Sequence, residues 1–271
     1  MVTTLDPNIL SPFQMLEPGI SLLASLIVSA ASVSLSLVVS WYFFRSYRFS
    51  GFGYLLGLPV GFVLLALSFA SQYLSLNYQY DLVLHPAFFW VQIVSQSEGF
   101  ALIAISYQFK NFEPARNGPY ISRLPAQSAY HRGHSESRNV LMSILPTVMI
   151  ALPFALPTSI FVLDPYFNYS RIADTGFCMI LFDMAVIAYI FKSTIVSLIK
   201  AGNVKLLYIP AAYALFFLEQ YSLTITYFDN SVIAFIGSLV ARILALALFV
   251  YVAHHVIHAS RRSEIEAREK A

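Results

Sequence analysis

Seven runs of mostly apolar residues follow one another along the chain, separated by more polar segments. Each run is about 20 residues long, the length that a helix needs to cross the hydrocarbon core of a bilayer. The pattern predicts an all-α polytopic membrane protein with seven transmembrane helices, near 20–43, 52–75, 87–109, 140–162, 176–199, 206–227 and 232–256. The predicted organisation is an N-terminal segment 1–19, a seven-helix domain 20–258 that includes a polar loop 110–139, and a charged tail 259–271.

The composition strengthens this interpretation. Of the 271 residues, 58% are hydrophobic and only 11% are charged, whereas soluble domains carry roughly a quarter charged residues. We therefore expect a multi-pass protein of the cell membrane whose main partner is the lipid bilayer. The first 19 residues contain no Lys or Arg, which argues against a cleavable signal peptide. The single cysteine, Cys178, excludes an intrachain disulfide framework.

The distribution of basic residues predicts the orientation. One side of the seven-span arrangement collects 14 of the 16 Lys and Arg residues: Arg45, Arg48, Lys110, Arg116, Arg123, Arg132, Arg138, Lys192, Lys200, Lys205, Arg261, Arg262, Arg268 and Lys270. The opposite side holds only Arg171, and Arg242 lies inside the seventh span. Because basic residues accumulate on the cytoplasmic side, we expect the N-terminus outside and the C-terminus inside.

Four ionisable residues lie well inside predicted spans: Glu98, Asp183, Glu219 and Arg242. At about 1.5 Å of rise per residue, all four fall about 10–17 Å from the outer ends of their spans. An unpaired charge at such a depth costs at least ~2.5–3.5 kcal/mol. We therefore expect one shared interior cluster in which Arg242 pairs with one or two carboxylates, since a guanidinium suits bidentate pairing.

Three acids and one base leave an excess of negative charge. A protonated acid, water or a bound cation would compensate for it. Gln92 and Ser95 on the helix of Glu98 add polar groups and favour a hydrated cavity open to the outside. The alternative interpretation is a purely structural ion pair that locks the third, fifth, sixth and seventh helices together.

Two further patterns concern packing and metals. Six serines follow one face of the first span, at spacings of three or four residues, and predict a helix-packing seam toward the bundle or toward another chain: Ser21, Ser25, Ser29, Ser32, Ser36 and Ser40. His254 and His258 share a face of the seventh helix. They are weak candidates for metal ligands because no third ligand stands beside them, and an interfacial helix cap is the alternative.

Motifs for catalysis and cofactors are absent from the sequence. We find no Gly-rich phosphate loop, nucleophile elbow or zinc-binding helix motif. The seventh span has no lysine for a retinal Schiff base. We expect no cofactor, no nucleic-acid partner and no catalytic residues, and catalysis is the least supported function. The loop 110–139 and the tail 259–271 are candidate contacts for a membrane or cytoplasmic protein partner.

Two stretches carry a resemblance. The segments "YRFSGFGYLLGLPVGF" and "QSEGFALIAISYQFKN" resemble uncharacterised seven-span membrane proteins of ammonia-oxidising archaea. The overall plan resembles the seven-helix sensory region that precedes prokaryotic histidine kinases. The layout of three spans, a lone fourth and three more spans is also similar to that of SWEET-type transporters. The resemblance transfers no functional residue.

These observations leave three hypotheses. The leading one is a sensory or signal-coupling membrane protein that binds a small solute, cation or proton in an outward-facing polar cavity. The second is a proton- or cation-coupled transporter of small solutes. The third is an accessory subunit of a membrane complex.

Overall fold

The computed structural model describes residues 18–50, 56–78, 84–110, 146–159, 169–201, 207–229 and 231–269. These ranges hold seven helices and no strand, which confirms the all-α prediction. The helices are α1 (Pro18–Ser50), α2 (Gly57–Asn77), α3 (Leu84–Lys110), an unlabelled helix Pro146–Ser159, α5 (Tyr169–Ala201), α6 (Tyr208–Asp229) and α7 (Val232–Glu269).

Five of the helices, namely α1, α2, α3, α5 and α7, are long and apolar enough to cross a membrane. The helix α6 is not among them, although it has 22 residues. Its sequence places Glu219 and Gln220 at its centre and several hydroxyl residues after them, which lowers its mean hydropathy. The helix Pro146–Ser159 is apolar but shorter than a span. The chain is therefore a membrane protein with several transmembrane helices.

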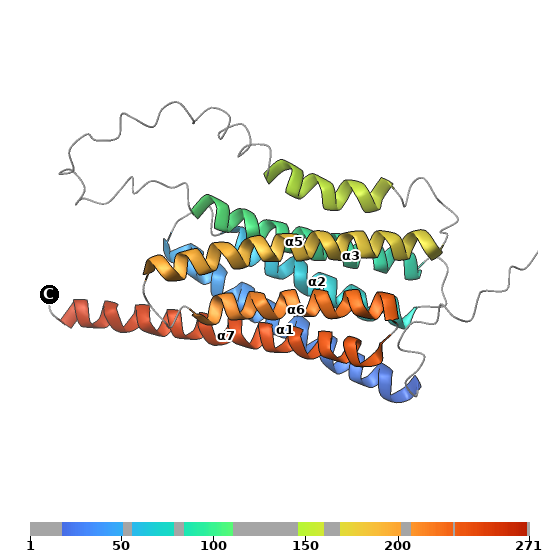
Figure 1. The fold of residues 1–271 in the computed structure, drawn as a ribbon. Coiled ribbons are helices and arrows are strands. Elements are labelled where there is room, and N and C mark those ends of the chain that lie inside the picture. Colours follow the sequence, from blue (N-terminus) through green and yellow to red (C-terminus); the bar gives the residue numbers. More distant parts are fainter. Residues whose placement is uncertain are drawn as a thin grey trace, which may run out of the picture.

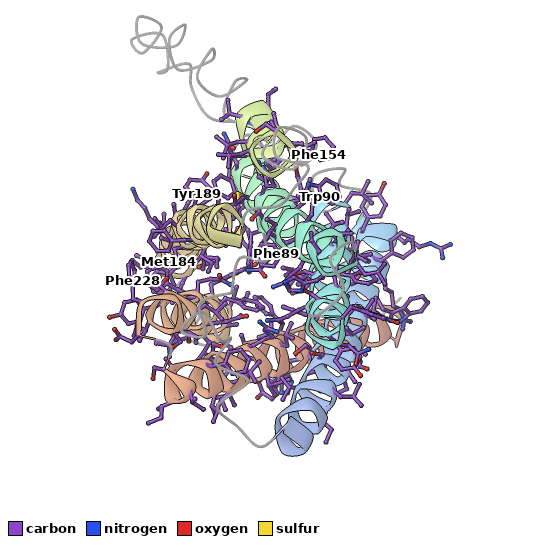
Figure 2. The ribbon with its side chains drawn as sticks, turned by 90° about the vertical axis from the view of Figure 1, so that its right-hand side faces the viewer. Phe89, Trp90, Phe154, Met184, Tyr189 and Phe228 are labelled. Atoms are coloured by element: carbon purple, nitrogen blue, oxygen red, sulfur yellow. The ribbon has the colours of Figure 1, made fainter. Side chains whose placement is uncertain are left out.

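Six of the helices form a closed ring. Their long axes run roughly side by side (Figure 1), and the neighbours in the ring are α1–α2, α2–α3, α3–α5, α5–α6, α6–α7 and α7–α1. The end view in Figure 2 shows the helix Pro146–Ser159 outside this ring, beside α3, where the Phe154 and Trp90 rings lie 6.0 Å apart. The neighbour order suits a layout of three helices, a separate fourth, and three more.

Large apolar side chains cover the outer surface of the ring. Examples are Trp41 on α1, Phe228 on α6 and Ile233 on α7, which are 66%, 71% and 84% exposed. Such exposed apolar side chains suit contact with lipid, because their exposure to water would be unfavourable in free energy. The ring thus places its apolar surface toward lipid and leaves the polar residues for its interior.

Aromatic side chains fill the interior at the end where α2 and α6 begin. We call Phe62, Phe100, Tyr107, Tyr213, Phe216 and Phe249 the aromatic cluster. Its contacts cross the ring, because Phe62 and Phe249 join α2 to α7 with ring centroids 5.1 Å apart, and Phe100 and Phe216 join α3 to α6 at 5.5 Å. Neither helix pair is adjacent in the ring. The cluster therefore fills this end of the ring.

The helices α2 and α3 approach each other closely at three glycines, Gly57, Gly61 and Gly99, of which the last two face each other. A Cβ atom built on Gly99 would lie 2.9 Å from the backbone oxygen of Gly61, and one on Gly61 would lie 2.8 Å from the oxygen of Gly99. Both distances are too short for a real Cβ atom. Only glycine permits this helix spacing, in the way that small residues allow close packing of membrane helices.

Candidate functional site

A buried ion pair joins α7 to α6. Arg242 Nε donates a hydrogen bond of 2.6 Å to Glu219 Oε1, and each side chain is only 1% exposed. The guanidinium also reaches α2, where Nη1 donates to Gln72 Oε1 at 2.6 Å. Its Cζ atom lies 4.4 Å from the centre of the Phe69 ring, which is cation–π geometry. Since α2 and α7 are not neighbours in the ring, Arg242 extends across the interior.

A second hydrogen-bonded chain joins α2, α3 and α5. Ser68 Oγ donates to Gln96 Oε1 at 3.3 Å, and Gln96 Nε2 donates to Asp183 Oδ2 at 2.9 Å. All three side chains are buried. Asp183 also lies close enough to Glu219, a member of the first hydrogen-bonded chain, for the two carboxyl groups to repel each other.

Both chains begin on one face of α2, because Ser68 and Gln72 are four residues apart and therefore stack one turn above the other. Together they connect all the ring helices except α1. We call the set formed by Ser68, Gln72, Gln96, Asp183, Glu219 and Arg242 the polar layer. Hydrogen bonds and charge bring these side chains inward, since each would be costly against lipid.

Buried atoms without hydrogen-bond partners lie in the polar layer and on two residues adjacent to it in the sequence, Gln220 and Ser97. They are Asp183 Oδ1, Glu219 Oε2, both side-chain amide atoms of Gln220 and, next to Gln96, the hydroxyl of Ser97. An unsatisfied buried polar group costs about 1–3 kcal/mol. The layer holds two carboxyl groups and one guanidinium, so Arg242 can neutralise the charge of at most one carboxylate. The layer therefore contains one acid more than its own base can neutralise.

The structure places the other predicted site residues outside this layer. Glu98 is half-buried and makes no ion pair or hydrogen bond with any residue in the described ranges. The Ser95 hydroxyl donates to the backbone oxygen of Val91, in its own helix, at 2.5 Å. Gln92 is half-buried on the same helix. The structure therefore pairs Arg242 with Glu219 and places Asp183 in a second hydrogen-bonded chain nearby, but it does not bring Glu98, Gln92 or Ser95 to them. The reason is the rotation of α3 about its own axis, which directs Gln96, rather than Glu98, toward α5.

The serine seam lies on the buried side of α1. Ser29, Ser32, Ser36 and Ser40 are at most 7% exposed, and Ser40 Oγ donates to the backbone oxygen of Pro59 on α2 at 2.8 Å. The side chains of the remaining two predicted members, Ser21 and Ser25, lie outside the described residues. This part of the seam packs against the bundle itself.

Of the two histidines predicted as weak metal-ligand candidates, only His254 has a side chain among the described residues. His254 is exposed, with its ring 6.2 Å from that of His255, and the side chain of His258 lies outside the described residues. Among the side chains that the structure describes, no group of three His, Cys, Asp or Glu residues is placed to hold a metal ion.

Sequence reasoning missed the two residues by which α2 holds Arg242, Gln72 and Phe69. A signal was present in the chain, since Ser68, Gln72 and Ser75 follow one face of an otherwise apolar helix at spacings of four and three. Such a polar stripe on a membrane helix indicates an interior face. It carries no charge, which makes it less conspicuous than the ionisable residues.

Comparison with known proteins adds no further assignment. The chain matches no protein-family model, no curated protein and no solved structure. The polar layer is therefore the feature of this chain that bears most directly on its function.

Proposed function

We propose that this chain is a membrane protein of the sensory or signal-coupling class, which binds a small solute, cation or proton in the polar layer. The observation that carries the proposal is that the buried Arg242–Glu219 ion pair lies near a second, incompletely satisfied carboxyl group, that of Asp183. Ionisable residues inside a membrane are costly and mark ion or ligand pathways. An ion pair serving only to lock helices would not need a second buried carboxyl group, that of Asp183, beside it.

One-sided access favours a sensor. The aromatic cluster fills the ring at the end where α2 and α6 begin, and Tyr213 within it is 1% exposed. Small hydroxyl side chains are buried at both ends, with Ser40, Ser106 and Thr194 at the aromatic end and Ser71, Ser75, Thr175, Thr226 and Ser238 at the other, so the bulky rings are what distinguish the two ends. A ligand would therefore enter from that second end, which the distribution of basic residues predicts to lie outside the cell.

The helix α7 provides a route for the signal. It carries Arg242 and continues without a break to Glu269, a distance of about 40 Å along the helix axis. In Figure 1 it extends beyond the other helices at the end marked C. A change in the pairing of Arg242 would alter how α7 packs against α6 and α1, and a rigid helix would transmit that shift to the tail and to a partner protein.

Electron–electron distance measurements on spin labels test this proposal. One label goes on the native Cys178, which is exposed on α5, and the other on a cysteine introduced by Ala267→Cys near the end of α7. Glu219→Gln removes the charge that holds Arg242, and we expect it to shift the distance distribution. Glu98→Gln is the matched control, because this glutamate lies in a span but outside the polar layer, and should leave the distribution unchanged. Identical distributions in all three proteins would contradict the proposal.

A coupled transporter requires access from both ends, which the aromatic cluster opposes. Purified protein in proteoliposomes should therefore show no solute or cation flux, with or without an imposed pH gradient. Sustained flux that is lost in Glu219→Gln would replace the sensory proposal by the transport one.

A further inference from the structure

We infer that the unpartnered oxygens beside the ion pair form a binding site for one monovalent alkali cation. The proposed ligands are Asp183 Oδ1, Glu219 Oε2, Gln220 Oε1 and Ser97 Oγ, which we call the cation site. This inference rests on the proposed function and specifies its ligand. It is carried by unsatisfied atoms on three helices, not by the acidic residues alone.

The two neutral ligands lie on α3 and α6, the helices that pack against α5, which carries Asp183. Ser97 lies beside the Asp183 carboxyl group, and its hydroxyl has no hydrogen-bond partner within 3.5 Å. Gln220 lies on the face of α6 that meets α5, because Thr224, one turn further along that face, contacts Met184 with a distance of 3.7 Å from Oγ1 to Sδ. Met184 follows Asp183 directly in the sequence. Ser97 and Gln220 are both 0% exposed, so neither can obtain a partner from bulk water.

The chemistry of these atoms selects the kind of ligand. Carboxylate, amide and hydroxyl oxygens are hard ligands that suit alkali and alkaline-earth ions. With both carboxyl groups ionised, Arg242 leaves one uncompensated negative charge in the layer. One monovalent cation makes the layer neutral, whereas a divalent ion would leave an excess positive charge in a low-dielectric interior.

Burial limits the size of the ligand. The four oxygens are almost completely shielded from solvent within the chain, so they do not line a wide opening. A single-atom ion fits such surroundings better than an organic cation does. Bound water alone would satisfy the hydrogen bonds but would not balance the charge.

Thermal unfolding of the full chain in detergent micelles tests the cation site. Choline chloride is replaced by NaCl at constant ionic strength, with KCl and LiCl as further probes. Because a ligand that binds only the folded state stabilises it, we expect the midpoint temperature to rise with NaCl and to reach a plateau. Asp183→Asn should abolish this rise. Glu98→Gln, a matched loss of charge in the same membrane region, should preserve it.

Equal midpoints in NaCl and choline chloride would overturn the inference, and so would an Asp183→Asn protein that responds to NaCl as the unmodified chain does. If Asp183→Asn does not fold, Ser97→Ala removes one neutral ligand instead. The NaCl concentration at half-effect should then rise several-fold, and an unchanged value would overturn the inference.

The outcomes separate this inference from the proposed function. If NaCl has no effect but Glu219→Gln still moves α7, the cation assignment fails and the sensory proposal stands, with a proton as the remaining ligand of the layer. If NaCl has no effect and α7 does not respond, both fail.

Discussion

Arg242 shows how one charged side chain can be accommodated inside a membrane bundle. Its guanidinium donates hydrogen bonds to a carboxylate oxygen on α6 and to an amide oxygen on α2, and it lies over the face of the Phe69 ring. The remaining cost falls on the acids, because Glu219 Oε2 and Asp183 Oδ1 each have no hydrogen-bond partner within 3.5 Å. The arginine is therefore the anchored member of the layer, and the carboxyl groups are the members free to bind something else.

Removing one partner of this pair should be far more costly than removing both. Arg242→Met leaves Glu219 buried without its cation, and we expect the free energy of unfolding to fall by ~3–5 kcal/mol. The double variant Arg242→Met/Glu219→Gln should recover part of this loss because no unpaired charge remains. Denaturant titration of the three proteins in micelles measures the difference. A double variant less stable than Arg242→Met would contradict the assignment of the pair.

At the residue scale the sequence predicted which charges are inside but not which of them meet. Asp183, Glu219 and Arg242 stand out because few other charges interrupt the apolar runs. Depth along a helix can be counted from the sequence, whereas rotation about the helix axis cannot. Glu98 has a suitable depth, yet the rotation of α3 turns its neighbour Gln96 toward Asp183.

At the scale of helices, α2 organises the site without contributing a charge. It contributes Ser68, a hydrogen-bond donor, to one hydrogen-bonded chain and Gln72, an acceptor, to the other. Its position against α3 depends on the contact between Gly61 and Gly99. The apolar pattern predicted both helices, but the sequence analysis did not identify this glycine contact, since it depends on which faces of two separate helices meet.

Alanine substitution tests the glycine contact. In Gly99→Ala the new Cβ atom would lie 2.9 Å from the backbone oxygen of Gly61, so the helices must separate, and we expect a loss of ~1–3 kcal/mol from overpacking. Gly237→Ala on α7 is the control, because the nearest atom to its Cβ, Ser222 Oγ, is 3.9 Å away. This variant should be as stable as the unmodified chain or more stable, since alanine favours a helix by up to ~1 kcal/mol over glycine. Equal effects of the two substitutions in thermal unfolding would show that α2 and α3 do not pack this closely.

At the scale of the whole molecule, the large aromatic side chains of the interior gather toward one end of the ring. The aromatic cluster, with Tyr213 and Phe249 at 4.9 Å between ring centroids, fills one half, and the polar layer lies between it and the other end. The count of seven apolar runs predicted the number of helices. It did not predict that six of them close into a ring with the fourth outside, because the order of neighbours is set by side-chain packing across the interior.

The orientation of this asymmetric ring decides from where a ligand reaches the polar layer. The positive-inside rule predicts that the loop 110–139 is cytoplasmic and that the segment around residue 168 is outside. Cysteine accessibility in intact cells measures this directly. In a Cys178→Ser background, an impermeant maleimide should label Asn168→Cys in intact cells and Ser128→Cys only after permeabilisation. Labelling in the reverse order would invert the topology. The aromatic cluster would then face outward, and the polar layer would be open to ligands of the cytoplasm.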